Sequence, residues 1–266
     1  MLPGLSPARR RVVLALLALL VLASTVLTVV LVSRPGTTAE PVEQARPGPV
    51  LLVPGYGGGT GSLQALAAEL RVHGRDATIV ALPGSGTGDL RASADVLGVA
   101  AAAALDRTGE DTVDVVGYSA GGLIARLWVA EGNADRVRRV LTLGSPHHGT
   151  SLADLAGSLA PDQCPEGCRQ MASGSDLLAE LNAGDETPEG PTWVSIWTTQ
   201  DETVTPPDSA RLDGALKLPV QSVCADARIG HGELPRSPLV HQMVLALLAA
   251  GDPVELGPAD CGRLSG

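Results

Sequence analysis

The chain has 266 residues, of which 44% are hydrophobic and only 2% aromatic, and it contains no phenylalanine. This length suits one substantial domain or two small ones, with a core built from Leu, Val, Ala and Ile. The net charge is −10, and residues 48–266 alone hold 14 basic and 27 acidic residues. A body that acidic repels phosphate backbones, which argues against a nucleic-acid partner.

The N-terminal region differs in composition from the rest of the chain. Three arginines, Arg9 to Arg11, precede residues 12–32, which contain no charge, proline or glycine. A helix of that length, at about 1.5 Å per residue, just spans a hydrocarbon core of roughly 30 Å. The length favours an uncleaved signal anchor over a signal peptide cut near residues 37–39. Either reading exports the body of the protein, because the arginines stay inside.

These features divide the chain into five parts. The parts are a cytoplasmic segment (1–11), a transmembrane signal anchor or signal peptide (12–32), a linker (33–47), a folded domain (48–252) and a C-terminal tail (253–266). We expect the protein on the outer face of the cell membrane, or secreted if the residues before about 40 are cleaved.

From residue 50 onward, apolar runs of strand length alternate with segments of helical periodicity. This alternation predicts an α/β fold, with a mostly parallel sheet and helices on both faces. A small insert near residues 151–191 breaks the rhythm, and we expect it over one edge of the sheet. Strands are expected at 50–53, 76–84, 111–119, within 136–149, at 193–198 and at 218–226, and helices at 62–74, 89–109, 120–130 and 237–251.

A serine stands between the third strand and the third helix, framed by glycines. Gly117, Ser119 and Gly121 form G-x-S-x-G, and Gly122 follows. Side chains at the flanking positions would collide with the neighbouring strand or helix at a turn sharp enough to expose the serine. The pattern therefore predicts Ser119 as a nucleophile.

A serine hydroxyl needs a histidine base, and that base needs an acid, in the chain order Ser, Asp or Glu, His. Of the five histidines, only His231 has both this order and a loop setting, and His148 is the reserve candidate. Asp201 comes first after the strand at 193–198 and is the predicted acid, with Asp226 as its rival.

A tetrahedral intermediate needs two hydrogen-bond donors. One is expected from the backbone N–H of Ala120, directly after the nucleophile, and the other from the N–H of Tyr56 in the loop after the first strand. That loop lacks the Lys and Ser/Thr of a P-loop. We expect no metal and no cofactor.

Four cysteines in an exported body suggest disulfides, and three pairings are open. Locality favours Cys164–Cys168 and Cys224–Cys261. A zinc site is the alternative, although no C-x-x-C or matched histidine spacing accompanies the cysteines.

Five separated segments carry a resemblance to a known family: "VLLVPGYGGG", "VDVVGYSAGGLIARLWV", "VLTLGSPHHGTSLA", "TTQDETVTP" and "GHGELPRSP". Together they resemble the secreted α/β-hydrolase lipases and esterases, the class 2 lipase group with its lipase-A-like relatives. The resemblance implies the α/β-hydrolase fold, carboxylic ester substrates, and Ser119, Asp201 and His231 as the triad. Family members usually carry His-Gly in the oxyanion loop, where this chain has Pro54-Gly55.

Three functions remain in competition. The first is an exported or anchored lipase or esterase, expected to be monomeric and to take a lipid or other ester. The second is an acyltransferase that passes the acyl group to a sugar or lipid hydroxyl. The third is a silent binding module, against which an intact Ser, Asp and His in order counts.

Overall fold

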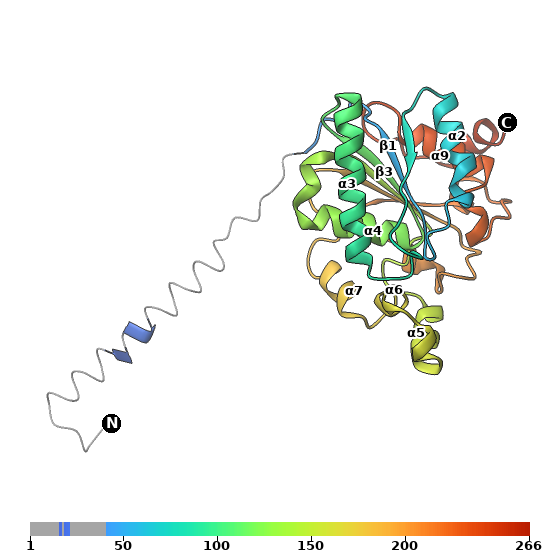
Figure 1. Ribbon diagram of the computed structural model, residues 1–266. Helices are drawn as coiled ribbons and strands as arrows, with labels where there is room; N and C mark the ends of the chain where they lie inside the picture. Colours follow the sequence, from blue (N-terminus) through green and yellow to red (C-terminus); the bar gives the residue numbers. More distant parts are fainter. Residues whose placement is uncertain (1–15, 18, 22–40) are drawn as a thin grey trace, which may run out of the picture. The chain divides into compact units, whose positions relative to one another are not determined.

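The computed structural model describes residues 16, 17, 19–21 and 41–266 of the chain (Figure 1). The chain divides into two units, residues 1–38 and 39–266. In the first unit the described residues are helical and exposed. The rest of the predicted signal segment and its alternative cut site lie outside the described residues. Within the described part of the chain, no helix is long and apolar enough to cross a membrane.

Six parallel strands form one sheet in the order β2-β1-β3-β4-β5-β6, which confirms the predicted parallel sheet. The chain adds β2 on one side of β1 and then returns to add β3 on the other side. This reversal places a topological switch beside β1 and β3, where the loops after the strands separate. The strands are β1 (Val50–Val53), β2 (Ala77–Ile79), β3 (Val113–Tyr118), β4 (Val137–Leu143), β5 (Thr192–Trp197) and β6 (Leu216–Pro219).

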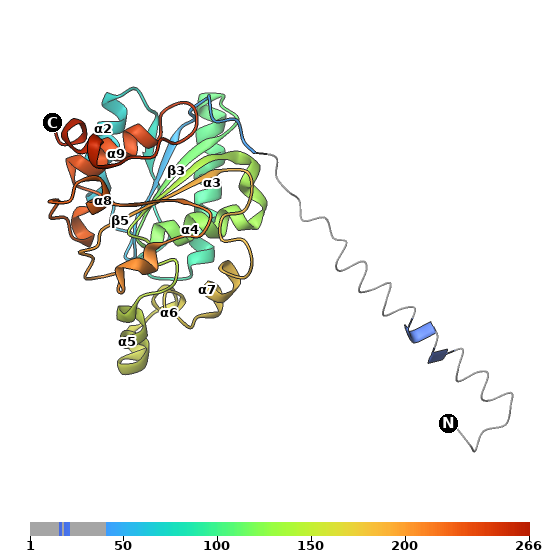
Figure 2. The same ribbon diagram turned by 180° about the vertical axis from the view of Figure 1, so that it is seen from behind.

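Helices lie on both faces of the sheet (Figures 1 and 2), and the alternation of side chains along the strands builds a core on each face. Val50 and Leu52 face the side covered by α2 and α9, whereas Leu51 and Val53 face the side covered by α3 and α4. Because both faces are covered, the strands are mostly apolar instead of alternating with polar residues, and their charged exceptions, such as Asp114 and Arg138, are buried. The main helices are α2 (Gln64–Val72), α3 (Leu90–Thr108), α4 (Ala120–Trp128), α8 (Val220–Val223) and α9 (Pro238–Leu247).

Short helical turns complete the domain. They connect the longer elements or close the C-terminus. They are η1 (Gly61–Leu63), η2 (Val129–Asn133), η3 (Ala134–Arg136), η4 (Pro161–Gln163), η5 (Pro207–Ala210), η6 (His231–Glu233), η7 (Pro258–Asp260) and α10 (Cys261–Leu264).

The predicted bounds of the sixth strand, 218–226, are wrong. The strand covers Leu216–Pro219, and Val220–Val223 form the short helix α8. Val220 and Val223 are both buried, and their i, i+3 spacing places them on one face of a helix. Pro219 has no N–H to continue the ladder, so the strand ends there.

The insert is built of three short helices. They are α5 (Ser151–Leu159), α6 (Glu166–Gln170) and α7 (Asp176–Leu181), and they lie beyond the carboxyl ends of the strands (Figures 1 and 2). Two contacts fix this position. The N–H of Gly167 donates to the carbonyl of Thr87, and the side chain of Gln170 accepts from the first amide of α3.

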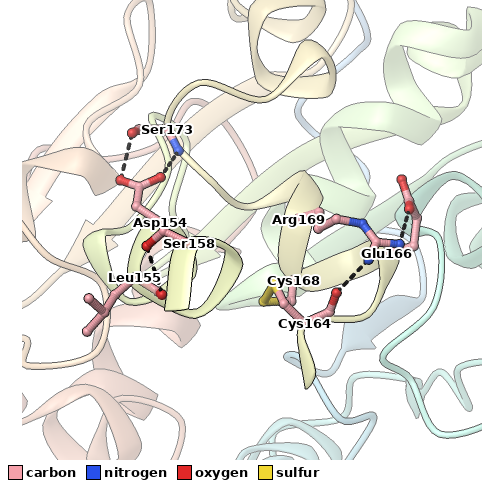
Figure 3. The surroundings of a disulfide bond; sticks show 8 residues. All are labelled: Asp154, Leu155, Ser158, Cys164, Glu166, Cys168, Arg169 and Ser173. Atoms are coloured by element: carbon pink, nitrogen blue, oxygen red, sulfur yellow. Dashed lines mark hydrogen bonds and ion pairs between the residues drawn. A yellow bond between two sulfur atoms is a disulfide. The ribbon is translucent and has the colours of Figure 1, made fainter. Parts of the chain in front are cut away.

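Both disulfides have the predicted pairing, Cys164–Cys168 and Cys224–Cys261. Around the first bridge, Arg169 donates to the carbonyl of Cys164, and Asp154 of α5 accepts from the amide and hydroxyl of Ser173 (Figure 3). This bridge therefore belongs to the insert.

The second bridge ties the end of the chain to the segment after β6. The residues beyond 252, expected to form a tail, contribute to the core, since Leu256 and Leu264 are 4% and 2% exposed.

Residues 41–47 of the predicted linker are bonded to the folded domain. The Gln44 side chain donates to the carbonyl of Arg138, and the amide of Val42 donates to the carbonyl of Gly190.

We predict that the two disulfides differ in their effect on thermal stability. The bridges close loops with sequence separations of 37 and 4 residues. Loop-closure entropy then assigns about 4 kcal/mol to Cys224–Cys261 and about 2 kcal/mol to Cys164–Cys168. Calorimetry of the two double Cys→Ala variants should show the larger fall in Tm for C224A/C261A. An equal or larger fall for C164A/C168A would contradict this ranking.

Candidate active site

Ser119 occupies a strained turn between β3 and α4. Its φ and ψ are 53° and −122°, and among the described residues it is the one non-glycine residue with positive φ. L-residues rarely adopt this backbone conformation, so the surrounding structure must impose it. The amide of Ser119 donates to the carbonyl of Leu143 at the end of β4, which holds the turn against the sheet.

The glycines of G-x-S-x-G stand where a side chain has no room. A Cβ on Gly117 would lie 2.5 Å from the carbonyl oxygen of Gly121, and one on Gly121 would strike the carbonyl of Val53 in β1. A Cβ on Gly122 would strike the hydroxyl of Ser145. These close approaches seat α4 on the strand ends and give the physical reason for the glycines that frame the serine.

The structure brings the three predicted side chains together in one hydrogen-bonded chain. Ser119 Oγ lies 3.1 Å from Nε2 of His231, and Nδ1 of the same ring lies 2.7 Å from Oδ2 of Asp201. Because a carboxylate only accepts, Nδ1 carries the proton and Nε2 is free to accept from the serine hydroxyl. His231 and Asp201 are each 5% exposed, so water competes little with this chain.

Asp201 is oriented by backbone amides that the sequence analysis did not identify. Its second oxygen, Oδ1, accepts from the N–H of Thr203 at 2.9 Å and of Val204 at 2.7 Å. This Asx-type turn leaves Oδ2 directed at the imidazole. An Asp followed by a short polar run after a strand is the signal that could have identified it.

The alternative acids and bases lie elsewhere. The rival acid, Asp226, is exposed. The reserve base, His148, is bonded through Nε2 to Glu186 at 2.9 Å. Its neighbour His147 is fully buried against Thr142, and burial lowers the pKa of His147 well below its ordinary value, with Arg126 and His148 adding to the effect. Neither ring contacts Ser119.

Two backbone amides beside Ser119 are free to donate. Among the described residues, neither the N–H of Tyr56 nor that of Ala120 has an acceptor. Ala120 begins α4, and the first amides of a helix have no intrahelical partner. The loop around Tyr56 is held by two bonds, since the amides of Gly57 and Gly58 donate to the carbonyls of Gly86 and Gly55. Tyr56 and Ala120 are the residues expected to supply the oxyanion donors.

The cysteines are engaged in disulfides, so they form no zinc site. In the part of the chain that the structure describes, no group of three or more His, Cys, Asp or Glu side chains could hold a metal ion. The arrangement of Ser119, His231 and Asp201 is suited to nucleophilic attack assisted by a general base.

Comparison with known proteins identifies this arrangement of strands and helices. Residues 48–163 match the family described by its alpha/beta hydrolase fold. The mature lipase BlEst2 of Bacillus licheniformis is similar in structure, with a TM-score of 0.64 and 22% identity over 79% of this chain and 96% of that one. A comparison with curated protein sequences found no significant match.

Two further structures resemble the chain. Lipase B of Aspergillus fumigatus gives a TM-score of 0.67 and 20% identity over 87% of this chain and 63% of that one. An extracellular α/β-hydrolase from a Paenibacillus species gives a TM-score of 0.51 and 15% identity over 77% of this chain and all of that one. At these identities the likeness concerns the fold.

We predict that Gly121→Ala destabilises the protein, because the added methyl group meets the rigid backbone of β1. The cost should be on the order of 3 kcal/mol, or roughly 6–12 °C in Tm for a domain of this size. Gly157→Ala is the matched control: Gly157 lies in the exposed helix α5 with nothing within 4 Å of the added Cβ, and the change should be neutral or slightly stabilising. Equal melting temperatures for the two variants would contradict the close-packed turn.

Proposed function

Because the chain has the α/β-hydrolase fold, we propose that it is a serine hydrolase that cleaves carboxylic esters through an acyl-enzyme. The observation that carries the proposal is the unbroken hydrogen-bonded chain from Ser119 through His231 to Asp201, beside two unengaged backbone amides. In this proposal Ser119 is the nucleophile, His231 the base, Asp201 the acid, and the amides of Tyr56 and Ala120 form the oxyanion hole.

The acylation step uses each group once. Ser119 Oγ attacks the ester carbonyl carbon while Nε2 of His231 takes the hydroxyl proton. Asp201 stabilises the imidazolium that forms, and the two amides donate to the oxyanion. When the tetrahedral intermediate collapses, the C–O bond to the alcohol breaks and His231 gives its proton to the departing alkoxide oxygen.

Deacylation repeats these steps with water as the nucleophile. His231 removes a proton from water, the hydroxide attacks the acyl carbon, and Ser119 leaves with the proton returned by His231.

An alcohol in place of water would make the enzyme an acyltransferase. Measuring free acid against transferred ester, with an alcohol acceptor added, separates the two activities.

Lipid esters are the proposed substrate class. Two of the similar structures are described as lipases, one bacterial and one fungal. The resemblance to class 2 and lipase-A-like lipases points in the same direction. Since the donor at Tyr56 is a backbone amide, the exchange of His-Gly for Pro54-Gly55 keeps the oxyanion chemistry possible.

We also propose that the protein is exported. Two disulfides within one domain are typical of an oxidising compartment and rare in reducing ones. The apolar run at 12–32, with arginines before it, would supply the signal. Anchoring by this segment remains a proposal.

We predict that Ser119→Ala abolishes hydrolysis of p-nitrophenyl esters, with kcat reduced by about 10⁴-fold or more, because no other group replaces the nucleophile. Ser158→Ala is the control, since Ser158 is exposed and its hydroxyl donates to the carbonyl of Leu155 in its own helix. Activity of S119A within tenfold of the unmodified protein would remove Ser119 from the mechanism.

We predict that Asp201→Asn lowers kcat by about 10⁴-fold, because an amide neither fixes the imidazole tautomer nor stabilises the imidazolium. Melting temperature should change little, since the Asn oxygen can still accept from the amides of Thr203 and Val204. The rival Asp226 is exposed, and Asp226→Asn should leave kcat unchanged. If the damage instead follows Asp226→Asn, the acid has been assigned to the wrong strand end.

A further inference from the structure

Tyr118, the last residue of β3, touches the histidine from two directions. Its ring centroid lies 5.2 Å from that of His231, with the planes tilted by 34°. Its hydroxyl donates to the backbone carbonyl of His231 at 3.3 Å. Aromatic rings at such distances attract one another beyond their contact area. One side chain therefore restrains both the ring and the backbone of the proposed base.

The same ring also supports the loop that carries the oxyanion donor. A Cβ placed on Gly55 would lie 3.3 Å and 3.4 Å from Cδ1 and Cε1 of Tyr118, and 3.1 Å from Cβ of Ser119. The backbone of Gly55 thus stands close to the Tyr118 ring. Gly55 immediately precedes Tyr56, whose amide is free to donate.

The environment keeps the Tyr118 hydroxyl protonated. Burial, helped by the nearby charge of Asp201 and opposed by Arg236, raises its pKa to about 12. The phenol is therefore a donor at every pH at which an ester hydrolase of this kind would work. It faces the backbone of His231, so it does not compete for the ring nitrogens.

We propose that Tyr118 is a positioning residue that aligns the imidazole of His231 and the Gly55–Tyr56 backbone with Ser119 Oγ. The proposal rests on the proposed function, because it assigns Tyr118 to the same reaction. It goes beyond that function by making one side chain responsible for both the base and an oxyanion donor. Tyr118 itself transfers no proton and forms no bond in the reaction.

The geometry shows why this alignment matters. Ser119 Oγ and His231 Nε2 are 3.1 Å apart, near the outer limit for a hydrogen bond to a hydroxyl. A displacement of about 1 Å in such an arrangement costs on the order of 10²-fold in rate. The ring should matter more than the hydroxyl, because the hydroxyl's hydrogen bond is long.

The test compares Tyr118→Phe with Tyr118→Leu on a soluble p-nitrophenyl ester. The phenylalanine keeps the ring, so kcat should stay within about threefold, the effect of one weak hydrogen bond. The leucine loses the ring, so kcat should fall about 10²-fold with KM within about threefold. The rate constant for inactivation by a fluorophosphonate should fall in parallel, since that reaction also needs the aligned base and donors.

A spectroscopic signature separates positioning from general loss of stability. The proton between Nδ1 of His231 and Asp201 should give a downfield proton resonance in the unmodified protein and in Y118F. In Y118L it should broaden or vanish, because the ring is no longer held. Val116→Ala is the matched control: Val116 lies two residues before Tyr118, is buried on the same face of β3 and packs in the same core. It should lower Tm and leave kcat and the resonance unchanged.

Gly55→Ala disturbs the contact between Gly55 and the Tyr118 ring from the loop side. It is the second test, used if Y118L does not fold. Its methyl group would press on Tyr118 and Ser119, so kcat should fall with KM little changed. The proposal is overturned if folded Y118L keeps kcat within threefold, if only KM changes, or if V116A loses as much kcat as Y118L. Full activity of S119A would overturn the proposed function instead, whatever Tyr118 does.

Discussion

The candidate site depends on one backbone constraint, the positive-φ conformation of Ser119. A non-glycine residue held in such a conformation costs about 1–3 kcal/mol, and it persists only where the surroundings impose it. Here the surroundings are the bond from Ser119 N–H to the carbonyl of Leu143 and the close approach of Gly117 and Gly121 to neighbouring backbone. The same turn lifts the Ser119 hydroxyl above the strand ends and leaves the amide of Ala120 unpaired.

The topology of the sheet supplies the other groups. Because the order in which strands are added reverses at β1 and β3, the loop holding Tyr56 and the turn holding Ser119 leave adjacent parallel strands toward opposite faces. Asp201 follows β5, and His231 lies in the segment that leads to α9. Ser119 and His231, which are 112 positions apart in sequence, thus meet at the edge of the sheet where the parallel strands end. The insert lies at this edge too, so it can influence access to Ser119.

The local signals in the sequence selected three side chains that lie within hydrogen-bonding distance in the structure, whereas the contacts that depend on distant partners could not be predicted. Glycine framing, chain order and loop setting pointed to Ser119, His231 and Asp201 as candidates. By contrast, charged residues in a central strand gave no sign of burial, yet Asp114 is fully buried and accepts from Arg138 at 2.8 and 2.6 Å and from Arg75 at 2.5 Å. The position of the insert and the helix after Pro219 likewise depend on neighbours distant in the sequence. The contacts of Tyr118 could not be predicted either, because they depend on the position of His231 in the folded chain.

The central claim is that Ser119 is activated by its neighbours into a nucleophile. Treatment of the folded protein with a fluorophosphonate, followed by mass spectrometry of the intact chain and of its peptides, tests this most directly. The account predicts one adduct per chain, located on Ser119, and no adduct after denaturation, because an isolated serine hydroxyl is a weak nucleophile. Absence of any adduct on the folded protein, or an adduct on another residue, would contradict the account.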